Sequence, residues 1–247
     1  MAYEVFADFY DKLTDNVEYS KRAQYILDIL KKHNHAPGLT LDLACGTGSL
    51  TLELKKAGVD IYGIDGSADM LSVALQKAAD ADEQILYLRQ KMQSIDLYGT
   101  IDTCLCTLDS LNHLTDKRDV EKTFSRVSLF MNPHGLFVFD VNTVYKHKEI
   151  LRDNVFVFDT DEVYCVWQNT PLEDNMVEIS LDFFIPEENN YYRMTETFRE
   201  RAYTVEELTQ MLSAAGFEVE AVYGDLTQLE PCETEQRLTF VARKMDI

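Results

Sequence analysis

Apolar runs of strand length alternate with helical segments along most of this chain. The apolar runs lie at 39–44, 59–64, 85–88, 101–106 and 136–141. The helical segments lie at 17–33, 50–57, 68–79, 119–131 and 204–215, and apolar residues recur three and four positions apart in the first of them. A further helix is expected over 3–13, and two closing strands over 217–222 and 238–242. This order predicts an α/β fold, with seven strands in a doubly wound, mainly parallel sheet and helices on both faces.

The region from about residue 155 to residue 202 departs from this alternation. Its runs at 155–158, 162–168, 176–184 and 191–201 are rich in aromatic residues and have turns between them, which indicates antiparallel strands. On its C-terminal side, Thr204 and Glu207 have the spacing of a helix capping box, and Gly216 is placed to end that helix. We therefore expect an antiparallel β insertion, over 154–202, between the fifth strand and the last helix.

The charge balance bears on possible partners. The chain has 43 acidic and 23 basic residues, a net charge of −20, and no basic run of five or more residues. A field of this sign repels a phosphate backbone, so nucleic acid is not an expected substrate. No apolar run approaches the roughly 18 residues of a membrane span, and the start does not have the pattern of a signal peptide. The expectation is a cytoplasmic protein of bacterial type that acts away from the membrane.

Cysteine and histidine spacing predicts neither a disulfide framework nor a metal site. The five cysteines include no C-x-x-C pair, and the five histidines do not cluster at metal-binding spacing. Cys104 and Cys106 alternate on a predicted buried strand and are expected to be small core residues. The prediction is therefore no disulfide framework and no metal.

The turn after the first predicted strand is the segment most informative about chemistry. It reads Asp42-Leu43-Ala44-Cys45-Gly46-Thr47-Gly48, and the second strand is followed by Asp65. Asp65 lies 19 residues after Gly46 (65 − 46), close to the ~20-residue spacing of a ribose-binding acid in a nucleotide-binding βαβ unit. Glycine lets a ligand approach the backbone, the helix start offers free N–H groups, and a carboxylate accepts hydrogen bonds from a ribose diol.

The turn does not have the third glycine of a dinucleotide-binding loop, because Thr51 occupies that position. That glycine lets helix and strand pack beside a pyrophosphate, so its absence favours a nucleoside ligand over a nicotinamide dinucleotide. A turn without any ligand would require the glycines and the acid to coincide by chance. We therefore predict that this turn binds S-adenosylmethionine.

With these motifs the chain resembles the class I S-adenosylmethionine-dependent methyltransferases over nearly its whole length. Residues 42–48 are similar to the family's first motif, 64–71 to its second, and 105–114 to the segment after the fourth strand. The opening, 6–19, looks like the start of small acidic methyltransferases of Gram-positive bacteria. A β insertion before the last helix also occurs in sugar N-methyltransferases and glycine N-methyltransferase.

The resemblance implies a Rossmann-like fold and S-adenosyl-L-methionine as the cofactor. It also implies a single domain over 1–247. Its expected parts are N-terminal helices at 1–36, a cofactor-binding core at 37–153 and 203–247, and the insertion at 154–202 as a substrate lid.

The resemblance implies roles for individual residues as well. In the family the acid at Asp65 holds the ribose, the residue at Met70 packs on the adenine, and the acid at Asp42 lies near the methionine amino group. An acid inside a buried strand is costly unless it is paired, which also favours this role for Asp42. Tyr10 and Tyr19 would close over the cofactor, although aromatic residues on helices also pack as core. The other expected cofactor contacts are Ala44, Gly46, Gly66, Lys91, Met92 and Leu108.

One position departs from the family pattern. An acid usually precedes the methionine after strand three, where it accepts a hydrogen bond from the adenine amine, but here the sequence is Gln90-Lys91-Met92. A lysine side chain has no acceptor. Adenine recognition is therefore expected to use backbone groups, Gln93 or stacking against Met92.

The sequence offers only candidates for catalysis. Asp109 and His113 follow strand four, at the edge where open α/β sheets bind ligands, and an imidazole can act as a general base near neutral pH. A solvated loop histidine is the preferred interpretation of His113. Trp167 and Tyr203 are candidates for a substrate pocket, or equally for packing in the core.

Methyl transfer is an in-line displacement at an activated carbon. Position and dehydration therefore matter most, and a base is needed only if the acceptor arrives protonated. The expected acceptor is a small molecule with an N or O nucleophile, methylated by a monomer or homodimer. A protein or RNA acceptor and a non-catalytic cofactor-binding module remain open alternatives.

Overall fold

A computed structural model of the chain describes residues 17–188 and 190–246. The helix expected over 3–13, which includes Tyr10, lies outside the described residues. The predicted contact between Tyr10 and the cofactor therefore stays a prediction.

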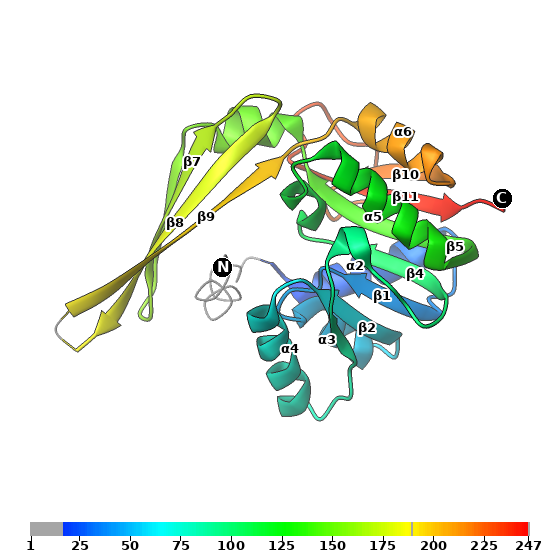
Figure 1. Cartoon of the computed structure of the whole chain (residues 1–247), viewed down its shortest axis with the longest axis horizontal. Helices are drawn as coiled ribbons and strands as arrows, with labels where there is room; N and C mark the ends of the chain where they lie inside the picture. Colours follow the sequence, from blue (N-terminus) through cyan, green and yellow to red (C-terminus); the bar gives the residue numbers. More distant parts are fainter. Residues whose placement is uncertain (1–16, 189, 247) are drawn as a thin grey trace.

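The core of the protein is a sheet with helices on both faces (Figure 1). Among the described residues this sheet has seven strands, in the order β10-β11-β5-β4-β1-β2-β3. The strands are β1 (Leu39–Leu43), β2 (Asp60–Asp65), β3 (Tyr87–Arg89), β4 (Ile101–Cys106), β5 (Met131–Asn142), β10 (Phe217–Gly224) and β11 (Arg237–Lys244). β11 runs antiparallel to β5 and β10, and the other neighbouring pairs are parallel. The predicted doubly wound, mainly parallel fold is confirmed.

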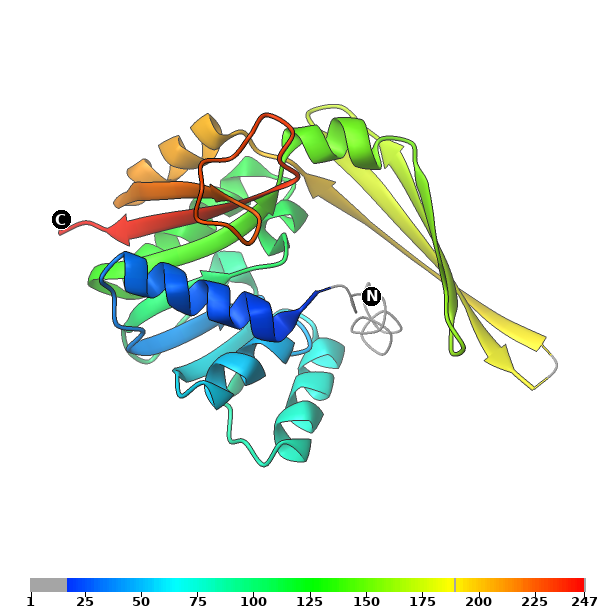
Figure 2. The ribbon, with the colours of Figure 1, turned by 180° about the vertical axis from the view of Figure 1, so that it is seen from behind.

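Two groups of helices bury the two faces of this sheet. α2 (Tyr19–Lys32) and α3 (Ser49–Lys56) pack on one face (Figure 2), and α5 (Lys117–Phe130) and α6 (Val205–Ala214) pack on the other. α4 (Ala68–Asp80) lies against β2, β3 and α3. The second face holds a group of fully buried phenylalanines, each contributing about 1.5–3 kcal/mol by burial: Phe124, Phe137, Phe139, Phe217 and Phe240. None of the described helices has the length and apolar character needed to cross a membrane.

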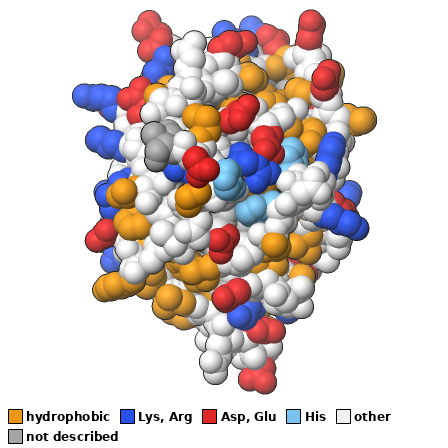
Figure 3. Space-filling view, turned by 90° about the vertical axis from the view of Figure 1, so that its right-hand side faces the viewer, with side chains coloured by type: hydrophobic (Ala, Val, Ile, Leu, Met, Phe, Trp, Pro, Cys, Tyr) orange, Lys and Arg blue, Asp and Glu red, His pale blue; other side chains and the backbone are white. Residues whose placement is uncertain are grey.

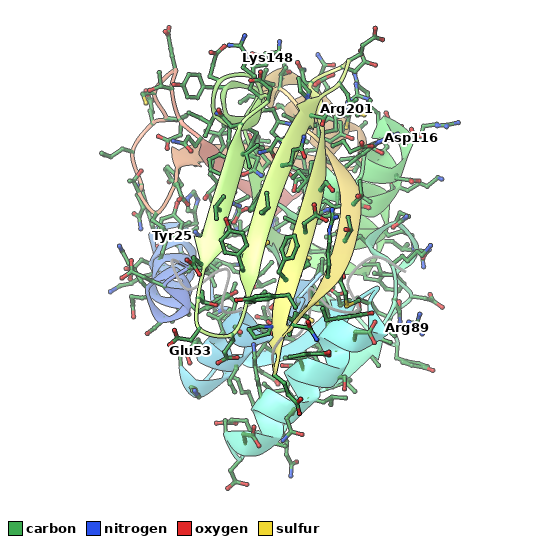
Figure 4. The ribbon with its side chains drawn as sticks, turned by 90° about the vertical axis from the view of Figure 1, so that its left-hand side faces the viewer. Tyr25, Glu53, Arg89, Asp116, Lys148 and Arg201 are labelled. Carbon is green, nitrogen blue, oxygen red and sulfur yellow. The ribbon has the colours of Figure 1, made fainter. Side chains whose placement is uncertain are left out.

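The insertion forms a second sheet that projects from the core as an arm (Figure 1). Its strands pair antiparallel in chain order: β6 (Val155–Asp159), β7 (Tyr164–Pro171), β8 (Met176–Glu187) and β9 (Asn190–Arg201). Figure 4 shows Lys148 and Arg201 at the same end of this arm, where it joins the core. The insertion therefore leaves the core where β5 ends and returns where α6 begins, at the carboxyl edge of the large sheet.

Local sequence signals predicted the boundaries of most long elements to within about three residues, but β5 begins at Met131, before the predicted start at 136, so the residues expected to form a turn after α5 belong to this strand. Thr204 and Glu207 form a reciprocal capping box at the start of α6, and Gly216, at φ +85°, follows its end. Three short helical segments were not predicted, because none is long enough to repeat a pattern. They are η1 (Met92–Ser94), η2 (Ser110–His113) and η3 (Lys146–Leu151), and the last two carry residues of the candidate site.

Candidate functional site

A pocket lies at the carboxyl ends of β1 and β4. Three segments contribute to its lining: the start of α2, the glycine turn and the loop after β4. The lining residues are Tyr19, Asp42, Ala44, Cys45, Gly46, Thr47, Ser49, Leu50, Thr107, Leu108 and Ser110. Of the predicted contacts, it brings together Tyr19, Asp42, Ala44, Gly46 and Leu108. This is the edge at which open α/β sheets bind their ligands.

The glycines of the turn have two different functions. Gly46 has φ +55°, and a Cβ added there would meet no heavy atom of the described chain within 4 Å, so the turn presents bare backbone to open space. Gly48 has φ +71°, and a Cβ there would lie 2.5 Å from the Tyr87 hydroxyl and 2.8 Å from the Ala74 side chain. Gly48 therefore allows the close packing of α3, and Gly46 leaves room for a ligand.

Thr51 takes the position of the missing glycine and has a polar role. Its hydroxyl donates to the Asp42 carboxylate at 2.5 Å, within the interior between β1 and α3. Asp42 is 2% exposed, and burial raises the pKa of its carboxyl to about 6, although the hydrogen bond from Thr51 opposes this. A buried carboxylate beside an open pocket is arranged to receive a positive charge.

Asp65 joins the glycine turn to the end of β2. One carboxylate oxygen accepts the Gly46 N–H at 2.9 Å, and the other accepts the Ser67 N–H at 2.8 Å. Burial raises the pKa of Asp65, while these N–H groups and the nearby His113 act in the opposite direction. Since a carboxylate offers about four acceptor positions, it can hold the turn and still receive a diol.

The residues predicted for the adenosine half lie further along the same edge. A Cβ on Gly66 would be 3.9 Å from Lys91 Cγ, so these two positions are neighbours. Lys91 is exposed, and Met92 is half-buried against the main core with its sulfur 3.9 Å from Cys106 Sγ. Met70 is buried in α4. These residues do not line the pocket described above, and their adenosine contacts stay predictions.

The loop after β4 is held by a network of charged groups. Leu108 and Asp109 both have left-handed backbone, at φ +57° and +55°, and both of their N–H groups donate to the Asp140 carboxylate. Arg237 bridges Asp140 and Asp109, with 2.6 Å between Arg237 Nη2 and Asp109 Oδ1. Arg22 of α2 lies 3.6 Å from the other oxygen of Asp140.

This network bears on the prediction that Asp109 takes part in catalysis. Burial alone would raise the pKa of Asp109, but the Arg237 guanidinium and the Lys146 ammonium outweigh it and hold the pKa well below its usual range. Such a carboxylate is a weak proton acceptor. The geometry favours a positioning role for Asp109 in the loop over proton transfer.

His113, the other catalytic candidate, meets the insertion. Its Nε2 lies 3.8 Å from Glu200 Oε1 at the end of β9, and its ring packs against Phe198 with centroids 5.2 Å apart. Ligand-capable atoms of Asp109, His113 and Glu200 all lie within 4.8 Å of one another. The sequence spacing of the histidines did not predict this grouping, since Glu200 comes from a distant strand.

The surroundings of this group oppose a divalent ion. Arg237 and Lys146 both place a positive charge near the Asp109 carboxylate, and Lys146 also acts on Glu200. We therefore assign no metal ligands, and the absence of a metal stays a prediction. All five cysteines are free thiols, and Cys104 and Cys106 are buried as predicted.

Two aromatic candidates for the substrate pocket have structural partners. The Trp167 indole N–H donates to Asn169 Oδ1 at 2.8 Å, and its ring packs against Phe156 and Phe158. Tyr203 is 2% exposed, and its hydroxyl donates to the Leu114 carbonyl. The packing interpretation therefore holds for Tyr203, and the Trp167 N–H is already satisfied within its own strand.

Several residues of the site were not predicted from the sequence. Asp140, in an apolar strand, carried the same signal as Asp42, because a buried acid needs a partner. Glu200 and Arg237 carried no comparable signal, since their partners lie about 90 to 130 residues away. Only the tertiary fold brings them to the pocket.

Comparisons with known proteins agree with this geometry. A family model described as a methyltransferase domain matches residues 40–135. The Bacillus subtilis protein named "Putative methyltransferase YqeM" is 35% identical over 246 residues, which cover 99% of this chain and 98% of that protein. A glycine/sarcosine N-methyltransferase of Parasynechococcus marenigrum is 30% identical over 141 residues, which cover 56% of this chain and 49% of that protein. The crystal structure of an S-adenosylmethionine-dependent methyltransferase from Clostridium acetobutylicum has a TM-score of 0.90 at 30% identity and covers 99% of both chains.

Proposed function

The chain belongs to the class I S-adenosylmethionine-dependent methyltransferases, and on that premise we propose that it methylates a small molecule with an N or O nucleophile. The observation that carries the proposal is the adjacency of two sites. The open pocket before Gly46 adjoins a charged cluster that the insertion completes with Glu200.

The cofactor fits the residues of the pocket together with Asp65 at the adjoining end of β2. Asp42, buried and bound to Thr51, would receive the methionine ammonium, and Asp65 would receive the ribose diol. The bare backbone at Gly46 leaves the space that the cofactor needs. The other contacts that we propose are Tyr19, Ala44 and Leu108 around the methionine half, and Gly66, Met70, Lys91 and Met92 around the adenosine half.

When bound, S-adenosylmethionine supplies an activated methyl group on a sulfonium. The chain's own contribution is to orient and dehydrate the acceptor. The loop that Asp140 holds presents Leu108 and Ser110 to the pocket, and the same segment carries His113 toward the insertion. The acceptor would then lie between this segment and the end of the insertion that joins the core. The insertion would act as a lid over it.

The charge of the protein supports a small acceptor over nucleic acid. The chain has a net charge of −20, and on the face in Figure 3 acidic and basic side chains are interspersed. A surface of this kind does not attract a phosphate backbone. The similarity to a glycine/sarcosine N-methyltransferase points in the same direction.

Calorimetry and a transfer assay test this function. We expect S-adenosylmethionine and S-adenosylhomocysteine to bind, and NAD to bind more weakly than either. Transfer of a radioactive methyl group is then screened on amines and hydroxylated metabolites, with bulk tRNA and a denatured protein mixture as competing acceptors. Labelling of the RNA or the protein, with none of the small molecules, would show that the proposed acceptor class is wrong.

A further inference from the structure

A buried glutamate at the root of the insertion lies between two histidines of the core. Glu200 has a side chain that is 5% exposed, on the last strand of the insertion. Its Oε2 lies 3.5 Å from His147 Nε2 of η3, and its Oε1 lies 3.8 Å from His113 Nε2 of η2. Asn142 Nδ2 donates to the first of these oxygens at 3.2 Å. The carboxylate is therefore held in place by β5 while it faces an imidazole on each side.

The hydrogen bond at the other ring nitrogen determines which nitrogen of a neutral His147 ring carries the proton. Its Nδ1 lies 2.9 Å from the backbone carbonyl of Asn175, which can only accept, so Nδ1 carries a proton. In a neutral ring, Nε2 would then present a lone pair to the Glu200 carboxylate. That nitrogen is buried and has no hydrogen-bond partner in the part of the chain that the structure describes. Two facing acceptors in a buried site are unfavourable, and a proton on Nε2 removes the conflict by forming an ion pair with Glu200.

His113 connects this pair to the pocket. It lies on the same short helix as Ser110, which lines the pocket, and its charge acts on Asp65 at the end of β2. Its side chain is 29% exposed, unlike that of Glu200. A molecule between the pocket and the insertion can therefore reach His113 but not the glutamate behind it.

The other charged groups around Glu200 have partners of their own, which leaves the two histidines as its ion-pair partners. Asp109 lies in the same cluster, but Arg237 neutralises it by a direct ion pair. The Lys146 ammonium is near both carboxylates, and its Nζ donates to Asn142 Oδ1. Burial lowers the pKa of Lys146 first, Arg237 lowers it further, and the carboxylates of Asp109 and Glu200 oppose both.

We infer that His113 is the proton acceptor for methyl transfer, that Glu200 stabilises its imidazolium form, and that the His147 imidazolium holds Glu200 ionised. This inference rests on the proposed function, and it applies to an acceptor that arrives as an ammonium ion. The ammonium N–H bond breaks and its proton moves to Nδ1 of His113, while Nε2–H faces Glu200. The freed nitrogen lone pair then forms the N–C bond, and the electron pair of the C–S bond goes to sulfur.

NMR of the histidine rings tests this arrangement without knowledge of the acceptor. The full chain, labelled with ¹⁵N in histidine and saturated with S-adenosylhomocysteine, is titrated between pH 5 and pH 10. His113→Gln and His147→Gln assign the signals. In the unmodified protein at pH 7.5 we expect both ring nitrogens of His147 to be protonated. In Glu200→Gln the His147 ring should be neutral with its proton on Nδ1, and the proton affinity of His113 should fall about tenfold or more, the effect of losing a nearby opposite charge.

A second variant removes the group that holds Glu200 ionised. In His147→Gln the buried Glu200 carboxyl should take up a proton, so His113 should bind its own proton less tightly, as in Glu200→Gln. Glu196→Gln, the same substitution on the same strand, is the matched control and should leave both rings unchanged. A neutral His147 ring in the unmodified protein, or a His113 titration unchanged in both variants, would overturn the inference. A His113 titration that changes on addition of EDTA would indicate a bound metal and overturn it as well.

Activity separates this inference from the proposed function. With glycine and sarcosine as probe acceptors, Glu200→Gln should lower kcat/KM about 100-fold at pH 7.5, and the difference should close near pH 10, where the amines arrive neutral. Calorimetry should give the same affinity for S-adenosylhomocysteine in all variants. If no small molecule is methylated but the NMR shifts appear, the proposed acceptor class fails and the histidine–glutamate arrangement stands. An equal loss of activity at pH 7.5 and pH 10 would show a structural effect and overturn the catalytic role.

Discussion

Replacing Asp42 by asparagine should separate the stability of the protein from its binding of the cofactor. The Asp42 carboxyl is 2% exposed, and burial raises its pKa from 3.8 to about 6. The gap between the folded and unfolded pKa values corresponds to about 3 kcal/mol in the free energy of unfolding. Asparagine has the same shape and no charge, and its carbonyl can still accept the Thr51 hydrogen bond.

The sign of this effect depends on pH. The folded chain binds a proton at Asp42 more tightly than the unfolded chain, so this group contributes stability below about pH 4, and the contribution is lost as the pH rises to about 6. At pH 7.5 we therefore expect Asp42→Asn to unfold with a free energy about 3 kcal/mol higher than the unmodified protein. The difference should disappear near pH 4. Urea unfolding followed by circular dichroism at both pH values measures it.

The same variant should lose affinity for S-adenosylmethionine. A hydrogen bond to a charged group contributes about 1.5–3 kcal/mol, which corresponds to a loss of about 10-fold to 150-fold in calorimetry at pH 7.5. Asp60→Asn, the same substitution at an exposed position, is the control and should change the free energy of unfolding by less than about 0.5 kcal/mol. An unchanged stability at pH 7.5 would refute the burial argument. An unchanged affinity would show that the methionine ammonium binds elsewhere.

Three further predictions follow from the same geometry. Gly46→Val should abolish cofactor binding. Gly58→Val is the control: it shares the positive φ and the open surroundings but lies outside the pocket, so it should lower the free energy of unfolding by only the ~1–2 kcal/mol of backbone strain, measured by urea unfolding. Equal binding of the cofactor by both variants in calorimetry would contradict this prediction. Asp65→Ala should weaken cofactor binding by about 1.5–3 kcal/mol, and an unchanged affinity would mean that the ribose is held by other groups. Arg237→Met should lower the free energy of unfolding by about 3–5 kcal/mol at pH 7.5, because it leaves Asp109 and Asp140 buried without their partner. The ion pair requires ionised Asp109, whose folded pKa is lowered, so its contribution to stability should fall as the pH drops below about 4. A small effect at neutral pH would show that water or Lys146 replaces the guanidinium.

The residues proposed to hold the cofactor could be recognised in the sequence because the information that identifies them is local. The turn at Gly46, the acid at Asp65 and the helix between them occupy one βαβ unit, so spacing along the chain determines their spacing in space. Asp42 could be recognised for a related reason, since an acid in an apolar strand needs a partner wherever the strand lies. What the turn did not reveal was that Thr51 is that partner. The missing third glycine indicated only that the loop does not bind a dinucleotide.

The arrangement of the proposed acceptor side depends on the tertiary structure. Asp109 and His113 could be located at the correct sheet edge from the strand order, but their chemistry depends on Arg237, Glu200 and His147. These partners come from β11, β9 and η3, and no periodic pattern or motif spacing connects them to η2. Secondary structure follows from interactions between residues near one another in sequence, whereas proton affinity follows from the charges within a few ångströms. For His113 those charges arrive only when the insertion folds back onto the core.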